Sequence, residues 1–247
     1  MAETVRLDRL LANLGYGSRR EVTAFVADGR VVLHGDRIAR VDQGVSLDDV
    51  RRGALTLDDE PLDPPAPLTV MLHKPRGYVC SHDEHGAIIY DLLPPRWKLR
   101  KPALSAAGRL DKDSTGQVIL TDDGELLHRI IHPKSHAAKQ YAVTLAHDLR
   151  GDEAALFATG TFLMRGDVKP LKAAFWAPDG PNSGAMTLHE GRFHQIRRMF
   201  ETLGNEVVTL HRYRTGALSL GALAPGEYRF LDDHARQEIF HTAESRQ

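Results

Sequence analysis

The least generic stretch of the chain is Gly108-Arg109-Leu110-Asp111-Lys112-Asp113-Ser114-Thr115-Gly116. Glycine at both ends permits tight turns, so we expect a loop that presents polar side chains. A carboxylate in such a loop, with cations beside it, can act as a nucleophile or as a general base. An ordinary surface turn, in which aspartate accepts backbone hydrogen bonds, explains the same residues. The stretch by itself therefore leaves both interpretations open.

A second distinctive stretch is Glu190-Gly191-Arg192-Phe193-His194-Gln195-Ile196-Arg197-Arg198-Met199-Phe200. Helical spacing places the apolar residues of this region on one buried stripe, which consists of Ile196, Met199, Phe200 and Leu203. Arg197 lies between members of that stripe, so its guanidinium starts near the core and needs a carboxylate partner. Arg192 and Arg198 are explained equally well as solvated residues of a basic helix face.

Around these stretches, strands and helices are mixed. Short apolar or alternating runs predict strands at 69–72, 139–145, 185–190 and 206–212. Helices are expected at 122–132, with Pro133 just past the end, and at 192–203, closed by Gly204. Strands outnumber helices, and many spacers are too short for crossover helices. We therefore expect an α+β fold, with a mainly antiparallel mixed sheet and flanking helices.

The N-terminal residues predict a separate small module. One helix is indicated by the buried stripe of Leu7, Leu10, Leu11 and Leu14, ended by Gly15 and Gly17. Ser18 and Glu21 form a capping box for a second helix, and Gly29 suits its C-terminal left-handed position. Two short apolar runs follow, at 31–33 and 38–41, around a turn at 34–36.

A proline-rich segment separates this module from the rest of the chain. Residues 63–67 read Asp-Pro-Pro-Ala-Pro, a stiff linker that cannot pair in a sheet. We therefore expect a module at 1–62, the linker at 63–67, a second domain at 68–235 and a tail at 236–247.

Composition restricts the class of protein without naming a function. The 247 residues are 42% apolar and 26% charged, and no segment reaches the length of a membrane span. The single cysteine, Cys80, excludes an internal disulfide framework and a Cys-rich zinc site. The net charge of −1 hides a basic region at 96–112, with six basic residues and one acid. Phosphate binding needs only such a local patch. We expect a cytoplasmic monomer that does not bind membranes.

Histidine spacing offers a weaker alternative. His128, His132 and His136 are four residues apart, a spacing that can bring metal ligands together on a helix. Pro133 interrupts that helix, and no carboxylate or cysteine joins at a suitable spacing, so no metal site is expected. Asp111 with Asp113 is likewise a poor paired-carboxylate hydrolase site, because adjacent loop positions rarely give that geometry.

Taken in order, these motifs resemble a known family. The stretch 108–116 resembles the catalytic-aspartate motif of the pseudouridine synthases, in the branch named for the bacterial small-subunit rRNA enzyme RsuA. Lys139-Gln140-Tyr141 matches the Lys-x-Tyr element of that branch, and 190–200 matches its later basic motif. Leu72-His73-Lys74-Pro75-Arg76-Gly77-Tyr78 resembles its first strand motif, where the family prefers Asn at the position of His73.

The N-terminal module resembles an S4 RNA-binding domain. The matching residues are Arg6-Leu7-Asp8, Ser18-Arg19 and Asp28-Gly29-Arg30-Val31. Together the likenesses run from Arg6 to about Leu231 in the right order. Two departures are Gln117, where the family usually has an aliphatic residue, and His34, where S4 domains often have Asn.

The resemblance implies isomerisation of uridine to pseudouridine in RNA. The C1′–N1 bond breaks, the base turns, and C5 joins C1′, which requires no redox change, group donor or metal. No cofactor is therefore expected, in agreement with the absence of a nucleotide-binding glycine loop. Asp111 is implied as nucleophile or base near C1′, Arg197 as its ion-pair partner, and Tyr141 as the residue that stacks on the flipped uracil and assists removal of the C5 proton.

The resemblance also implies a set of RNA-binding residues in both domains. They are Arg6, Ser18, Arg19, Arg20, Arg30, Lys74, Arg109, Lys112, Lys139, Arg192, His194, Gln195 and Arg198.

The implied substrate is 16S rRNA, free or in a small-subunit assembly intermediate. The pair His194-Gln195 is typical of the small-subunit branch, whereas large-subunit enzymes more often have Asn-Arg nearby, and this favours the helix 18 uridine. Two alternatives stay open: the same chemistry on 23S rRNA, and a non-catalytic RNA-binding or ribosome-assembly factor on the same scaffold.

Overall fold

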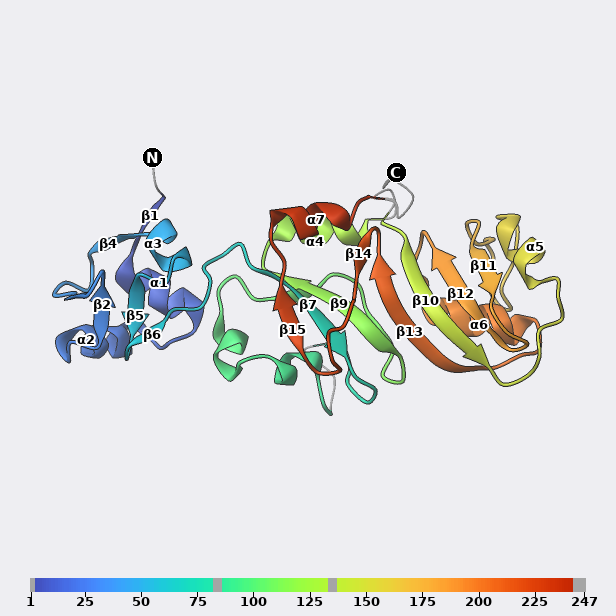
Figure 1. The fold of residues 1–247 in the computed structure, drawn as a ribbon, viewed down its shortest axis with the longest axis horizontal. Coiled ribbons are helices and arrows are strands. Elements are labelled where there is room, and N and C mark those ends of the chain that lie inside the picture. Colours follow the sequence, from blue (N-terminus) through green and yellow to red (C-terminus); the bar gives the residue numbers. More distant parts are fainter. Residues whose placement is uncertain (1–2, 82–85, 133–136, 242–247) are drawn as a thin grey trace. The chain divides into compact units, whose positions relative to one another are not determined.

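A computed structural model describes residues 3–81, 86–132 and 137–241. The chain forms two compact units (Figure 1). The first consists of Met1–Leu68, Leu93–Ser105 and Thr121–Gly124, and the second of Thr69–Leu92, Ala106–Leu120 and Glu125–Gln247. The first unit thus includes two short segments that follow the expected linker in the sequence. None of the described helices has the length and apolar character needed to cross a membrane.

The described part of the first unit contains small helices and two small sheets. The helices are α1 (Leu7–Leu14), α2 (Arg19–Ala27), α3 (Leu47–Arg51) and the 3₁₀ helix η2 (Pro95–Leu99). One sheet pairs β1 (Thr4–Arg6) with β4 (Gly44–Ser46). The other has the order β3 (Asp36–Arg37), β2 (Val31–Leu33), β5 (Leu55–Leu57) and β6 (Glu60–Pro61).

Local sequence signals account for the first two helices. The leucine stripe of α1 lies in the core of the unit, with Leu7 and Leu11 fully buried. The capping box of α2 is confirmed: Ser18 Oγ accepts from the Glu21 amide at 3.3 Å, and Glu21 Oε2 accepts from the Ser18 amide at 2.7 Å. Gly15 ends α1 at φ 87°, and a Cβ there would lie 2.3 Å from the carbonyl oxygen of Arg96. Only glycine fits that position.

The hairpin after α2 differs from the expected one. The second strand is β3 at Asp36–Arg37, and the apolar residues 38–41 lie outside any strand. His34 and Gly35 both take positive φ, at 53° and 89°, so the strands are joined by a tight two-residue turn that brings Asp36 opposite Leu33. Asn readily adopts this backbone conformation as well, which accounts for His34 standing where S4 domains often have Asn.

The second unit is built on a mixed, mainly antiparallel sheet of nine strands in its described part. The continuous order is β11 (Phe175–Pro178), β12 (Ser183–Leu188), β10 (Lys139–Leu145), β13 (Val207–Thr215), β9 (Thr115–Thr121), β7 (Thr69–Lys74) and β15 (Tyr228–Phe230). Two short strands complete it: β14 (Leu218–Ser219) beside β13 and β8 (Ser105–Ala106) beside β9. The pairing of β13 with β9 is parallel. The predicted α+β class with a mainly antiparallel sheet is confirmed.

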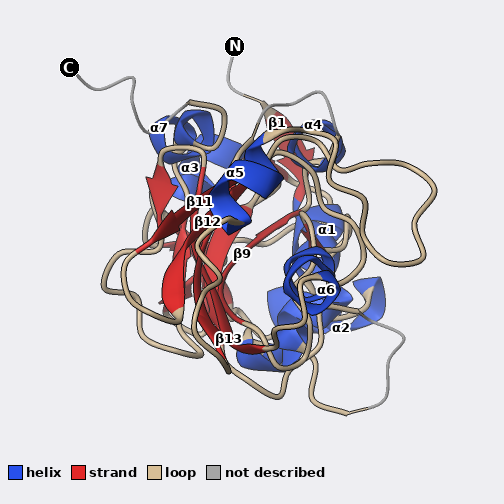
Figure 2. Cartoon of the chain, turned by 90° about the vertical axis from the view of Figure 1, so that its right-hand side faces the viewer, coloured by secondary structure: helices blue, strands red, loops and turns tan. Residues whose placement is uncertain are grey.

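Short helices flank this sheet. They are η1 (Ile89–Leu92), α4 (Gly124–Ile131), α5 (Glu153–Ala158), α6 (Gln195–Thr202) and α7 (Asp233–Glu238). Helix α6 packs beside β13 and buries Ile196, Met199 and Phe200 (Figure 2). It begins at Gln195 rather than at the expected residue 192, because His194 adopts a left-handed conformation that a right-handed helix cannot include.

The junction of β9 and β13 requires unusually close backbone contact. Gly116 takes φ 111°, and a Cβ there would lie 2.1 Å from the carbonyl oxygen of Arg212. The following residue, Gln117, is fully buried, and its Nε2 donates to the carbonyl oxygen of Leu218 at 2.9 Å. Gln117 thus packs in β9 in place of the aliphatic residue usual in the family, with its Nε2 hydrogen-bonded and its Oε1 buried without a partner among the described residues.

Candidate active site

A pocket of about 700 Å³ lies entirely within the second unit. Its walls are the loop that precedes β9, strands β10 and β13, and the turn that precedes α6. Asp111 comes from the loop, Lys139 and Tyr141 from β10, and Arg212 from β13. The volume is in the range of sites for nucleotide-sized ligands. The fold therefore brings the distinctive motifs, which are far apart in the sequence, into one cavity.

The loop that carries Asp111 is held in place by Lys74. The Lys74 ammonium donates to the carbonyl oxygens of Ser114 at 2.6 Å, Pro75 at 3.1 Å and Lys112 at 3.2 Å. Its side chain is fully buried, and burial lowers the pKa of Lys74. RNA contact by Lys74 stays a prediction, and in the structure all three donors of its ammonium point to backbone carbonyls inside the protein.

A guanidinium and an imidazole approach the carboxylate of Asp111 from the α6 end. Arg197 Nε lies 3.7 Å from Asp111 Oδ2, and His194 Nε2 lies 3.3 Å from Asp111 Oδ1. The Asp111 side chain is 31% exposed, so a ligand in the pocket can reach it. The carboxylate beside Arg197 is thus that of Asp111, the ion-pair partner that the resemblance implies. The contact of His194 was not anticipated from the sequence.

Arg197 is anchored at its other end. Its Nη1 donates to the carbonyl oxygen of Val207 at 2.9 Å, which fixes the guanidinium against the start of β13. Its Nη2 is buried and has no hydrogen-bond partner among the described residues. A buried guanidinium nitrogen without a partner is costly, so this position of Arg197 carries an energetic penalty.

Strand β10 supplies an aromatic side chain and an amine. Tyr141 is 9% exposed and lines the pocket opposite Arg212 in the β10–β13 register. Burial, with a smaller effect of the nearby Arg212, lowers the pKa of Lys139 to about 8. Arg212 is itself buried and donates from Nε to the carbonyl oxygen of Gln117 at 2.7 Å. The pocket therefore offers one flat apolar surface beside several positive groups.

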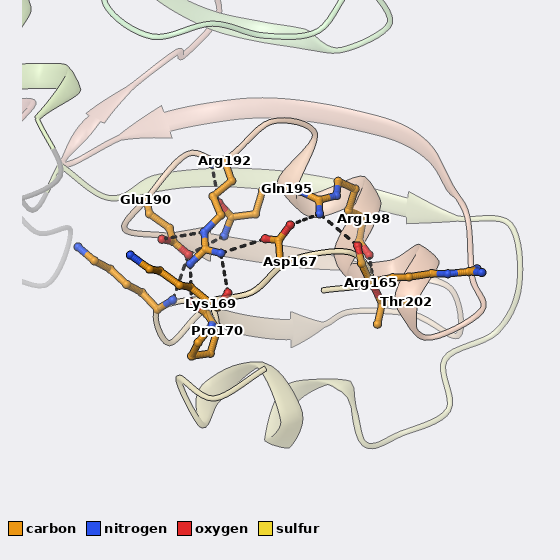
Figure 3. A network of polar contacts seen from close by, with 10 residues as sticks. Arg165, Asp167, Lys169, Pro170, Glu190, Arg192, Gln195, Arg198 and Thr202 are labelled. Atoms are coloured by element: carbon orange, nitrogen blue, oxygen red, sulfur yellow. Dashed lines mark hydrogen bonds and ion pairs between the residues drawn. The ribbon is translucent and has the colours of Figure 1, made fainter. Parts of the chain in front are cut away.

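The turn before α6 is tied down by a polar network (Figure 3). The Arg192 guanidinium donates to Asp167 at 3.0 Å and to the carbonyl oxygen of Lys169 at 2.8 Å, while Arg198 pairs with the other oxygen of Asp167. These contacts hold Arg192 and Arg198 partly buried, at 28% and 26% exposure. Both are therefore engaged within the protein, and neither is the fully solvated residue that the sequence left open.

Gln195 closes the same turn internally. Its Oε1 accepts from the amide of Arg192 at 2.9 Å, and its Nε2 donates to Glu190 at 3.2 Å. The residue is 4% exposed. RNA contact by Gln195 stays a prediction, and in the structure its side-chain amide is hydrogen-bonded inside the protein.

The other residues predicted to bind RNA fall into two groups. Arg109 and Lys112 are exposed at the pocket, and Lys139 lines it. Five of these residues belong to the first unit, namely Arg6, Ser18, Arg19, Arg20 and Arg30. Three of these five have local roles: Ser18 caps α2, Arg6 pairs with Asp8 at 3.0 Å, and Arg30 pairs with Asp58 at 2.6 Å. Arg19 and Arg20 are exposed at the start of α2.

The roles of three residues of the site were not recognisable from the sequence. Asp167 precedes its partner Arg198 by 31 positions, and Lys74 precedes Ser114 by 40. Phe193 stood within the basic motif as an apparently ordinary apolar residue. As for metal binding, no group of three or more histidine, cysteine, aspartate or glutamate side chains gathers among the described residues, and His136 lies outside them.

The fold and this site define a class of protein. A family model described as RNA pseudouridylate synthase matches residues 69–202, more than half of the chain. A solved structure described as a crystal structure of pseudouridylate synthase superposes with a TM-score of 0.65 at 36% identity, covering 95% of this chain and 99% of the other. The chain therefore belongs to the RNA pseudouridylate synthase family, and its fold is the pseudouridine synthase fold.

Curated relatives narrow the resemblance further. Ribosomal small subunit pseudouridine synthase A of Salmonella typhimurium is 40% identical over 234 residues, covering 93% of this chain and 97% of the relative. The enzyme of the same name from Escherichia coli is 39% identical with the same coverage. The uncharacterized RNA pseudouridine synthase YtzG of Bacillus subtilis is 40% identical over 233 residues, covering 93% and 95%. The predicted membership of the RsuA branch is confirmed, and the chain is an RNA pseudouridine synthase.

Proposed function

We propose that this enzyme converts one uridine of 16S rRNA to pseudouridine, and that the target is the helix 18 uridine. Two observations support the small-subunit target: the names of the relatives from Salmonella typhimurium and Escherichia coli, and the pair His194-Gln195 in the turn before α6. The reaction itself is carried by one observation, the carboxylate of Asp111 at a nucleotide-sized pocket between Arg197 and His194.

Asp111 is the catalytic carboxylate of this proposal. Breaking the C1′–N1 bond requires either attack on the sugar or removal of a sugar proton, and an ionised carboxylate serves both routes. The Arg197 guanidinium 3.7 Å from Oδ2 and the His194 imidazole 3.3 Å from Oδ1 restrict the rotation of the carboxylate. Arg197 and His194 therefore act by orienting Asp111.

Tyr141 provides the surface on which the target base stacks. A uridine inside an RNA helix is out of reach of a pocket carboxylate, so it has to leave its stack. An aromatic side chain compensates for part of the stacking that the base loses. Tyr141 is 9% exposed and lines the same pocket as Asp111, so a flipped uracil would contact both residues.

The remaining RNA is held by exposed cations. Arg109 and Lys112 flank Asp111 in its loop and are placed to contact the phosphates on either side of the flipped nucleotide. The N-terminal residues 1–62 act as an S4 RNA-binding domain, with Arg19 and Arg20 as its exposed phosphate contacts. We also propose that the enzyme acts in the cytoplasm and as a monomer.

Tritium release from rRNA labelled at C5 of uracil tests this function. The wild type and Asp111→Asn are offered 16S rRNA, partly assembled small-subunit particles and 23S rRNA in parallel. We expect the wild type to release one equivalent of tritium from one of the two small-subunit substrates, and Asp111→Asn to release none. Mapping the modified position then identifies the uridine.

Other outcomes contradict defined parts of the proposal. Release from 23S rRNA alone overturns the target but retains the reaction. Tight binding without release from any of the three substrates overturns the reaction and favours an assembly factor. Rescue of a deletion phenotype by Asp111→Asn would show that RNA binding, and not isomerisation, carries the biological role.

A further inference from the structure

Phe193 is a large apolar side chain exposed at the rim of the active-site pocket. It is 77% exposed, although it lines the same pocket as Asp111 and Tyr141. One face of its ring is covered by the imidazole of His194, with ring centroids 3.8 Å apart and planes 16° from parallel. A phenylalanine of this exposure does not stabilise the core of the unit, so its position calls for another explanation.

The stack of Phe193 on His194 continues directly into the catalytic centre. His194 Nε2 lies 3.3 Å from Asp111 Oδ1, so the imidazole that covers one face of the phenyl ring also contacts the carboxylate. Because Phe193 itself lines the pocket, a flat group stacked on its other face would lie at the rim of the pocket.

The backbone that presents this stack is rigid and strained. His194 takes φ 49° and ψ 35°, a left-handed conformation that residues other than glycine rarely adopt. The turn is held on both sides: the Gln195 amide donates to the carbonyl oxygen of Arg192 at 3.2 Å, and Gln195 Oε1 accepts from the Arg192 amide at 2.9 Å. Such strain persists only where surrounding contacts determine the conformation.

The network of Figure 3 supplies those contacts. Asp167 holds Arg192 and Arg198, and Glu190 accepts from Gln195 Nε2 at 3.2 Å. Arg192 also donates to the carbonyl oxygen of Lys169 at 2.8 Å. The aromatic ring is thus pre-organised before any ligand binds, which lowers the entropic penalty of binding.

The surroundings of Phe193 favour a nucleobase over other flat groups. Arg109 and Lys112 are exposed cations on the same pocket, so a ligand stacked on the ring would have positive charge available for its phosphates. Aromatic rings next to cationic grooves bind single-stranded nucleic acid by stacking on successive bases. A polyphosphate without a base would have no flat group to stack on the ring.

We propose that Phe193, backed by His194, is the stacking platform for the nucleobase adjacent to the uridine in the pocket. Phe193 acts as a binding contact: it holds the flanking base of an opened RNA strand while the target base turns toward Tyr141. The proposal rests on the proposed function, because it takes the pocket to be the uridine site.

Three variants test the platform. Phe193→Leu keeps an apolar side chain but removes the flat ring, Phe193→Tyr restores it, and Phe175→Leu is the control, since Phe175 is 57% exposed and lies outside the pocket. The substrate carries 2-aminopurine next to the target uridine, and binding is measured in an Asp111→Asn background, where no turnover occurs. Single-turnover tritium release is measured with Asp111 intact.

Stacking quenches the fluorescence of 2-aminopurine, so we expect Phe193→Leu to lose this quenching and to bind the RNA about 10- to 100-fold more weakly. Phe193→Tyr and Phe175→Leu should behave as the wild type. Thermal melts of the four proteins should coincide, because the ring is exposed. Normal tritium release together with equal binding and quenching in Phe193→Leu overturns the platform alone. Absence of release from wild-type protein overturns the proposed function and the platform with it.

Discussion

Asp111 is the residue on which the proposed chemistry depends, and asparagine tests it by a conservative substitution. Asparagine has the same shape but no charge, so Asp111→Asn should fold normally while losing about 10³-fold or more in single-turnover rate. The matched control is Asp113→Asn in the same loop, whose carboxylate is 63% exposed and contacts Arg76 at 3.4 Å. The measurement is tritium release with a thermal melt of each protein. Equal losses in both variants would show that loop conformation, and not the Asp111 carboxylate, matters.

Lys139 makes a prediction about pH dependence at the same scale. Its pKa falls from an ordinary value of 10.5 to about 8 in the folded protein, chiefly because it is buried. Below about pH 8 the amine is charged in both folded and unfolded states, and its burial destabilises the fold in full. Between pH 8 and 10.5 the folded protein releases a proton that the unfolded chain keeps, so stability rises with pH in that window.

The change is measurable as a difference between two proteins. The pKa difference corresponds to about 3 kcal/mol at most. Lys139→Met should therefore be more stable than the wild type at pH 7, and this advantage should shrink between pH 8 and 10.5. Urea unfolding at several pH values provides the measurement, and comparing the two proteins cancels the contribution of other groups such as Lys74. Parallel stability curves would contradict the burial of a charged Lys139.

At the scale of elements, the start of α6 determines where both partners of Asp111 lie. The helix begins one residue after His194, and its first turn carries Arg197 and Arg198. Asp167 holds this end of the helix through Arg198 and Arg192, and these two arginines, Arg198 more strongly, lower the pKa of the Asp167 carboxyl. The support thus comes from a loop outside the helix.

Removing that support should reduce activity without removing any residue of the pocket. Asp167→Asn weakens both ion pairs, so Arg197 and His194 lose their fixed position, and we expect the rate to fall about 10- to 100-fold. Asp167→Glu should recover part of this loss. Asp233→Asn, at an exposed ion pair of α7, is the control and should be indistinguishable from the wild type. A Kd that rises while the single-turnover rate stays constant would assign Asp167 to RNA binding instead.

At the scale of the whole molecule, the proposed RNA contacts are divided between the two units. Arg19 and Arg20 are exposed in the first unit, whereas the pocket is confined to the second. Replacing both arginines by alanine should weaken binding and lower the slope of log K against log salt by about 1 to 2, because each phosphate contact releases counterions. The rate at saturating RNA should not change.

The control for this pair is Arg40→Ala with Arg51→Ala. Both side chains are exposed in the first unit and pair with neighbouring acids, at 3.1 Å to Asp42 and 2.9 Å to Asp48. Filter binding over a salt series separates the two double variants. A slower rate at saturation in the Arg19 and Arg20 variant would mean that the first unit takes part in positioning the target base.

The sequence by itself predicted the elements whose signals are local. Leu7–Leu14 and the capping box of Ser18 and Glu21 depend on spacing within one or two helical turns, and the strand at Lys139–Leu145 depends on alternation along one segment. The order of the motifs is also a property of the sequence alone. It indicated the family and, through that resemblance, the pairing of Asp111 with Arg197. What it misplaced were boundaries set by backbone conformation, such as the start of α6 at Gln195.

Only the tertiary structure decided which way the polar side chains of the motifs face. Lys74 and Gln195 point into the protein, His194 reaches Asp111, and Phe193 stands exposed at the pocket. Each of these outcomes depends on a segment distant in the sequence that supplies a carbonyl, a carboxylate or open space. The identity of a charged residue in a motif is the same whether its side chain contacts RNA or a loop carbonyl. The fold brings together β7, the Asp111 loop, the Asp167 loop and α6. Only this arrangement distinguishes residues that are free to bind RNA from residues that support the site.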